Sequence, residues 1–112
     1  MEQPVDIASL RSITGGDTEL ESELFRSFLA SSQDCLQGLR EAIKTQNPNA
    51  WRDSAHAFKG ICLNLGAGPL AELCKQAQDG FQGPTENKKL LMTAIEGEYG
   101  RVRAVVEGMI VA

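Results

Sequence analysis

Apolar residues recur every three or four positions along nearly the whole chain, and short stretches containing Gly, Pro or Asn are what interrupt this helical period. No internal repeat and no low-complexity tract is present. A chain of 112 residues can bury one hydrophobic core but is too short for two. The pattern therefore predicts an all-α fold with residues 1–112 as a single domain, and it excludes a two-domain enzyme.

The first half of the chain predicts two helices. A short helix over 6–13 carries Ile7 and Leu10, ends at the glycine pair 15–16 and is expected to act as a lid. A long helix over 18–45 is expected to begin with a capping box, in which Thr18 and Glu21 satisfy each other's free backbone N–H. Its predicted apolar face comprises Leu20, Leu24, Phe25, Phe28, Leu29, Leu36, Leu39 and Ile43.

Three more helices are predicted in the second half. The third runs to Leu65, with Asn47 as its cap, Pro48 at its first position and Gly66 as its left-handed stop. The fourth covers 68–81 and the last covers 86–110, with its apolar face at Leu91, Ile95, Val102, Val105 and Met109. Four amphipathic helices joined by short turns bury their apolar faces against one another, which predicts an up-down antiparallel four-helix bundle with a short N-terminal helix.

Charge and cysteine content narrow the class of partners. The net charge is -4 and the Lys and Arg residues are scattered, so nucleic acid and membrane surfaces are not expected as partners. The polar N-terminus does not resemble a secretory signal, which favours a cytoplasmic location. Cys35, Cys62 and Cys74 lack the spacing of zinc or redox pairs, so they are expected to be buried, reduced thiols, and no metal site is predicted.

The single histidine lies on the third predicted helix. Trp51, Phe58 and Cys62 belong to a narrow apolar stripe, and at about 100° per residue His56 lies about 140° away from Trp51. A lone histidine is ordinarily a satisfied core or surface side chain, and this angle excludes the core position. An exposed neutral imidazole is a nucleophile that can attack phosphorus.

Three neighbours of His56 favour phosphoryl chemistry. Lys59 lies one turn after the histidine and can pair with a phosphoryl group, while Arg52 lies one turn before it and adds longer-range attraction. Gly60 costs the helix about 1 kcal/mol relative to Ala, which indicates that space beside the ring is needed. Tolerated sequence drift is the alternative explanation for Gly60.

At these residues the chain resembles the histidine-containing phosphotransfer (HPt) domains, the relay modules of multistep two-component signalling. The segment 56–60, HAFKG, and the segment 64–67, NLGA, are similar to the His-x-x-Lys-Gly and Asn-Leu-Gly-Ala signature of that family. The resemblance extends over the whole chain in length and helix order. The residues 61–63 depart from it, because many relatives have small side chains there.

The resemblance implies a role for each site residue. His56 would be the phosphoacceptor, Lys59 would stabilise the phosphoryl group, and Gly60 would give clearance to an incoming receiver domain. Gln78 matches a glutamine that several relatives hydrogen-bond to the other ring nitrogen, although it is equally a solvated helix residue. Leu63 lies about 120° from Trp51, near the angle of His56, and is expected to contact a partner.

The resulting prediction is a histidine phosphocarrier that relays a phosphoryl group between aspartates of receiver domains, in response regulators or a hybrid histidine kinase. It would be a phosphotransfer intermediate rather than an independent catalyst, and a monomer. No cofactor is expected, and Mg²⁺ is expected only on the partner receiver. The main alternative is a helical adaptor that binds a receiver or kinase without being phosphorylated. A phosphotransferase-like dimer with an ATP-binding remnant and a metal-binding bundle are weaker alternatives.

Overall fold

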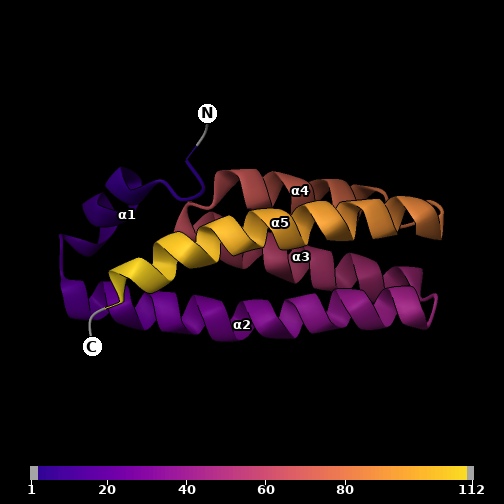
Figure 1. Cartoon of the computed structure of the whole chain (residues 1–112), viewed down its shortest axis with the longest axis horizontal. Helices are drawn as coiled ribbons and strands as arrows, with labels where there is room; N and C mark the ends of the chain where they lie inside the picture. Colours follow the sequence, from indigo (N-terminus) through magenta and orange to yellow (C-terminus); the bar gives the residue numbers. More distant parts are fainter. Residues whose placement is uncertain (1–2, 111–112) are drawn as a thin grey trace.

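The computed structural model describes residues 3–110, and within this range the ordered elements are five helices. They are α1 (Ile7–Thr14), α2 (Thr18–Lys44), α3 (Pro48–Leu65), α4 (Gly68–Asp79) and α5 (Thr85–Met109). Helices α2 to α5 alternate in direction, and α5 returns to pack on both α4 and α2 (Figure 1). The predicted all-α, up-down antiparallel bundle with a short N-terminal helix is confirmed.

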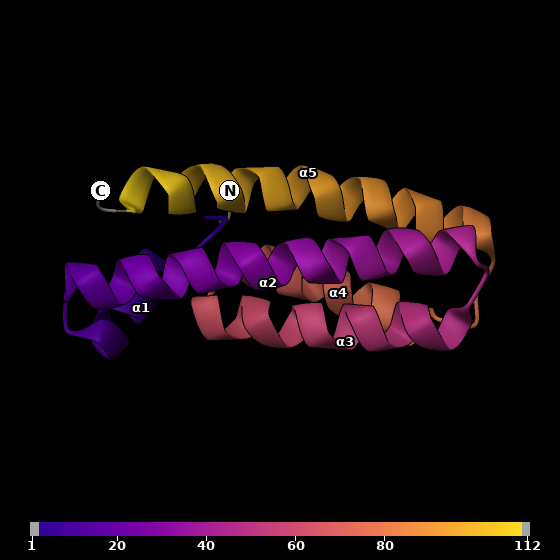
Figure 2. The same cartoon turned by 90° about the horizontal axis from the view of Figure 1, so that it is seen from below.

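The helices of the bundle differ in length, and this determines its shape. Helices α2 and α5 have 27 and 25 residues, whereas α3 and α4 have 18 and 12. The first turns of α2 and the last turns of α5 therefore extend beyond the α3–α4 turn, and α1 lies at this end (Figure 2). We call this part of the bundle the overhang. Four helices surround the core only in the other part.

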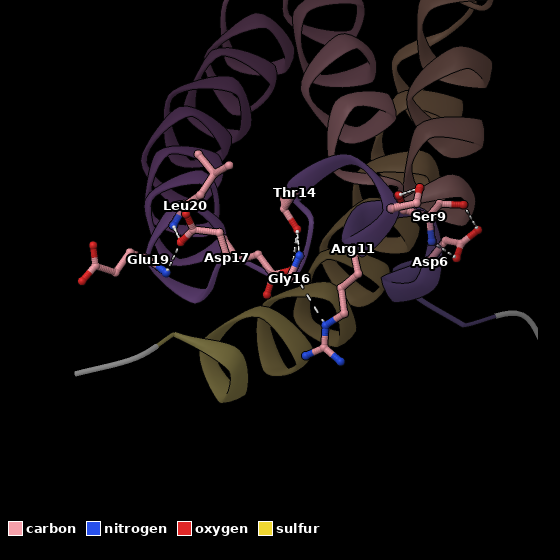
Figure 3. A network of polar contacts seen from close by, with 10 residues as sticks. Asp6, Ser9, Arg11, Thr14, Gly16, Asp17, Glu19 and Leu20 are labelled. Atoms are coloured by element: carbon pink, nitrogen blue, oxygen red, sulfur yellow. Dashed lines mark hydrogen bonds and ion pairs between the residues drawn. The ribbon is translucent and has the colours of Figure 1, made fainter.

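The start of α2 differs from the prediction. The cap is Asp17, whose Oδ1 accepts hydrogen bonds from the backbone N–H groups of Glu19 and Leu20 at 3.0 and 3.1 Å (Figure 3). The predicted Thr18–Glu21 capping box is therefore wrong, because Thr18 is already helical. The buried Glu21 carboxylate instead accepts a hydrogen bond from the Thr14 hydroxyl at 2.8 Å, which joins α1 to α2.

The ends of α3 agree with the prediction. Asn47 Oδ1 accepts a hydrogen bond from the backbone N–H of Ala50 at 3.0 Å, and Pro48 occupies the first turn. Gly66 ends the helix with φ of 84°, a left-handed conformation that glycine adopts without strain. Its carbonyl oxygen accepts a hydrogen bond from the backbone N–H of Asp6 at 2.9 Å, so the segment before α1 is fastened to this turn.

Two of the predicted apolar faces require correction. Leu20 and Leu24 are exposed, because their angles place them to one side of the buried face that Glu21, Ser22 and Phe25 form in the same turns of α2. On α5, Leu91, Val105 and Met109 are only partly buried. The buried face of α5 follows an alternating spacing of four and three and comprises Lys88, Met92, Ile95, Tyr99, Val102 and Val106.

Several apolar faces meet in the core around aromatic side chains. The Tyr99 ring lies 6.3 Å from the ring centre of Phe28 and 6.1 Å from that of Phe58, so α5 contacts α2 and α3 here. On α4, Leu70, Cys74 and Ala77 are buried, but Phe81, which the predicted range 68–81 includes, lies beyond the helix, which ends at Asp79. No helix in residues 3–110 is long and apolar enough to cross a membrane.

The three cysteines are free thiols. Cys62 and Cys74 are buried as predicted, whereas the predicted burial of Cys35 is wrong, because this side chain is only partly covered. A hydrogen bond to the Cys74 thiol and burial in the core raise the pKa of Cys62. Burial also raises the pKa of Cys35, which is only partly covered. A raised pKa lowers the fraction of reactive thiolate at neutral pH.

We therefore expect slow alkylation of the folded protein by N-ethylmaleimide at pH 7. Cys35 should be modified first, whereas Cys62 and Cys74 should be modified only when the bundle unfolds. Mass spectrometry of tryptic peptides after timed labelling measures this order. Rapid modification of Cys62 in the native protein would contradict it.

Candidate functional site

The site is built on the outer face of α3. Trp51, Ala55, Phe58, Cys62 and Leu65 form its buried face, as the sequence predicted. The Trp51 indole Nε1 donates a hydrogen bond to the backbone oxygen of Ala77 at 2.8 Å, which fixes α3 against α4. Because the core face is held in this way, His56 projects from the opposite side and is exposed.

One ring nitrogen of His56 has a partner on the neighbouring helix. His56 Nδ1 lies 3.4 Å from Oε1 of Gln78, a half-buried side chain on α4. An amide oxygen accepts hydrogen bonds and cannot donate them, so this contact favours the tautomer with the proton on Nδ1. Nε2 then carries the free lone pair, and because it has no hydrogen-bond partner within residues 3–110 it is available to a reactant. Gln78 was predicted either to contact the histidine ring or to be a solvated helix residue, and the structure places it at the ring.

The two predicted cations have different surroundings. Arg52 Nε lies 3.5 Å from Asp53 Oδ1, and its guanidinium lies 4.9 Å from the centre of the Phe81 ring. This stacking contact was not predicted, because Phe81 was placed on α4 and in fact follows the helix. Lys59 is half-buried and has no ion pair within residues 3–110. Of these two cations, Lys59 carries the charge that is not neutralised by a carboxylate.

The glycines at 38 and 60 both lie inside helices but have different surroundings. A Cβ atom on Gly38 would contact the Ser54 side chain, with 3.2 Å to the Ser54 Cβ, so this glycine allows α2 to approach α3 closely. Gly38 cannot be recognised from the sequence, because its role depends on the register between α2 and α3. A Cβ atom on Gly60 would have no packing neighbour within 4 Å. The missing side chain at Gly60 is therefore not required by packing within the bundle.

Leu63 completes the surface on this side of α3. Its side chain is 60% exposed, as expected for a residue that lies near the angle of His56 on the helix. The structure thus brings His56, Lys59, Gly60 and Leu63 to one face of α3 and adds Gln78 from α4. Within residues 3–110, no group of three His, Cys, Asp or Glu side chains is arranged to hold a metal ion.

Comparisons with known proteins show the family to which the chain belongs. The chain has 27% sequence identity to the crystal structure of histidine-containing phosphotransfer protein B (HptB) from Pseudomonas aeruginosa PAO1. The match covers 96% of this chain and 95% of that chain, with a TM-score of 0.88. None of the curated proteins matches the chain. The family model of the Hpt domain matches residues 23–106, which include all of α3 and α4, and the chain therefore belongs to the Hpt domain family of histidine phosphotransfer proteins.

Proposed function

We propose that this chain is a phosphocarrier that accepts a phosphoryl group on His56 from an aspartyl phosphate of one receiver domain and delivers it to an aspartate of another. The receivers belong to response regulators or to a hybrid histidine kinase, the classes of protein with which Hpt family members interact. The observation that carries the proposal is an exposed imidazole whose Nδ1 is paired with Gln78 and whose Nε2 is open.

Transfer of the phosphoryl group requires only the His56 imidazole and the aspartyl phosphate of the receiver. The Nε2 lone pair of His56 attacks phosphorus, a P–N bond forms, and the P–O bond to the aspartyl carboxylate breaks. The leaving carboxylate takes the electron pair of that bond. The proton on Nδ1 remains in the hydrogen bond to Gln78, so the product is a phosphoimidazolium. Transfer to the second receiver is the reverse reaction with a different aspartate.

The bundle contributes position and charge, which are the main terms in catalysis of phosphoryl transfer. Lys59 pairs with the phosphoryl oxygens, Gly60 leaves space for the aspartate-bearing loop, and Leu63 provides apolar contact with the receiver. Arg52 adds longer-range attraction at the edge of this surface. Mg²⁺ belongs to the receiver, so the chain acts as a transfer intermediate that needs its partner for catalysis.

A rival function is an adaptor that binds a receiver or kinase without being phosphorylated. The two functions make opposite predictions about a covalent bond, although both use the same surface. The open Nε2 of His56 favours the phosphocarrier, because an adaptor has no need for a nucleophilic nitrogen at the centre of its binding face.

The deciding experiment is incubation of the purified chain with a panel of receiver domains carrying radioactive aspartyl phosphate. We expect transfer of label to the chain within minutes from at least one receiver, and its recovery on a second, unlabelled receiver. The bond should be stable in base and labile in acid, as a phosphoramidate is. Receiver binding without transfer of label would support the adaptor instead.

A further inference from the structure

The contact between His56 and Gln78 also fixes the register of α3 against α4. Gln78 lies opposite His56, and the turn at Gly66 makes the two helices antiparallel (Figure 1). Lys59 lies three residues after His56 on α3, and Lys75 lies three residues before Gln78 on α4. Each step is about 4.5 Å toward the same end of the bundle. The two lysines therefore lie at the same level, one on each side of the α3–α4 interface.

The helical angle of Lys75 places it on the same side of α4 as Gln78. At about 100° per residue, Gln78 lies about 40° from the buried Cys74 and Lys75 lies about 100° away in the same direction. Lys75 is exposed, and its angle places it on the solvent side of α4 next to Gln78. A flexible four-carbon side chain at this position can extend toward the open side of the His56 ring.

The ion pairs of the protein leave this pair of lysines without carboxylate partners. Arg11, Arg40, Arg52, Lys89, Arg101 and Arg103 each have a carboxylate oxygen within 4 Å. Lys59 and Lys75 have none within residues 3–110, although Glu72 and Asp79 lie about one turn to either side of Lys75 on α4. Positive charge that is not neutralised is thus present on both α3 and α4 beside His56.

We propose that Lys75 is a second phosphoryl-binding residue, which acts with Lys59 from the other side of the α3–α4 interface to hold the oxygens of a phosphoryl group on His56. A phosphoryl group brings close to two negative charges, and one lysine neutralises only part of them. Arg52 is less suited to this role, because Asp53 and Phe81 already engage its guanidinium. The inference rests on the proposed function, because it names a further binding group for the same reaction.

The test compares Lys75→Gln, Lys75→Arg and a matched control, Lys44→Gln. Lys44 is the exposed last residue of α2 and lies outside the site. The quantity measured is the equilibrium ratio of phosphohistidine to aspartyl phosphate with a receiver that labels the wild type. Lys75→Gln should lower this ratio by about threefold to tenfold, in the range for charge-assisted contacts at an accessible site. Lys75→Arg should restore most of it, and Lys44→Gln should match the wild type.

A second measurement separates failure of this inference from failure of the proposed function. Phosphoramidate, a small anionic phosphoryl donor, labels histidine without a protein partner. Its labelling rate at His56 should fall by about threefold to tenfold in Lys75→Gln and become less sensitive to salt. If no receiver labels the wild type, the proposed function is wrong and this rate still tests Lys75. Equal ratios or rates in Lys75→Gln and Lys44→Gln, with equal melting temperatures, would overturn the role of Lys75.

Discussion

His56→Gln is expected to abolish acceptance of the phosphoryl group, with label on the chain falling to the level of an unlabelled control. The glutamine amide nitrogen has its lone pair delocalised into the carbonyl group, so no nucleophile remains at this position. His56 is the only histidine, and no other residue on this face supplies an imidazole. The loss should therefore be complete rather than partial.

The fold of this variant should be unchanged, which makes the result easy to interpret. His56 is exposed, and a surface substitution of this kind changes the free energy of unfolding by about 0.5 kcal/mol or less. A thermal melt and a receiver titration serve as controls, since binding should persist without transfer. Retention of acid-labile label by His56→Gln would place the phosphoryl group elsewhere and refute the proposed function.

Gly60→Gln should stabilise the helix and yet slow phosphoryl transfer. Glutamine is nearly as favourable as alanine inside a helix and glycine is about 1 kcal/mol worse, so the free energy of unfolding should rise by up to that amount. The Cβ atom of the new side chain meets no packing neighbour within 4 Å. It would, however, occupy the space one turn from His56 where the aspartate of a receiver must approach. A displacement of about 1 Å at the reacting atoms can slow transfer by about a hundredfold.

Gly97→Gln is the matched control for this experiment. Gly97 is also an exposed glycine inside a helix, and a Cβ atom there would have no packing neighbour within 4 Å. It lies on α5, away from the outer face of α3. Both variants should melt a few degrees higher than the wild type, but only Gly60→Gln should transfer more slowly. Wild-type transfer by a stable Gly60→Gln would mean that Gly60 is not reserved for a partner.

Much of the fold could be predicted because its signals are local. Asn47, Pro48 and Gly66 each act through the backbone of their own turn, so the ends of α3 agreed with the prediction. The start of α2 was misplaced by one residue, because Asp17 and Thr18 are both good caps and the choice depends on Glu21. Glu21 is engaged by Thr14, and a contact across two helices is not visible in a local pattern.

In the candidate site too, some features follow from the local sequence and others depend on contacts between helices. The exposure of His56 follows from its angle on α3 relative to Trp51, which the chain itself specifies. The approach of Gln78 to the ring and the contact of Arg52 with Phe81 depend on how α4 is aligned with α3. That alignment is set in part by the Trp51 indole and the Ala77 backbone, so Lys75 could not be placed opposite Lys59 before the structure was known.

The overhang has a consequence for how a partner meets this protein. His56 lies near the middle of α3, within the four-helix part, while α1 and the overhang lie beyond the α3–α4 turn. The proposed phosphorylation face therefore rests on the part of the bundle in which four helices surround the core, a support that is formed before any encounter. Binding then needs little ordering of this chain, so its entropic cost is small. Association needs no conformational change of this chain and can therefore be fast, which would suit the proposed carrier as it moves from one receiver to the next.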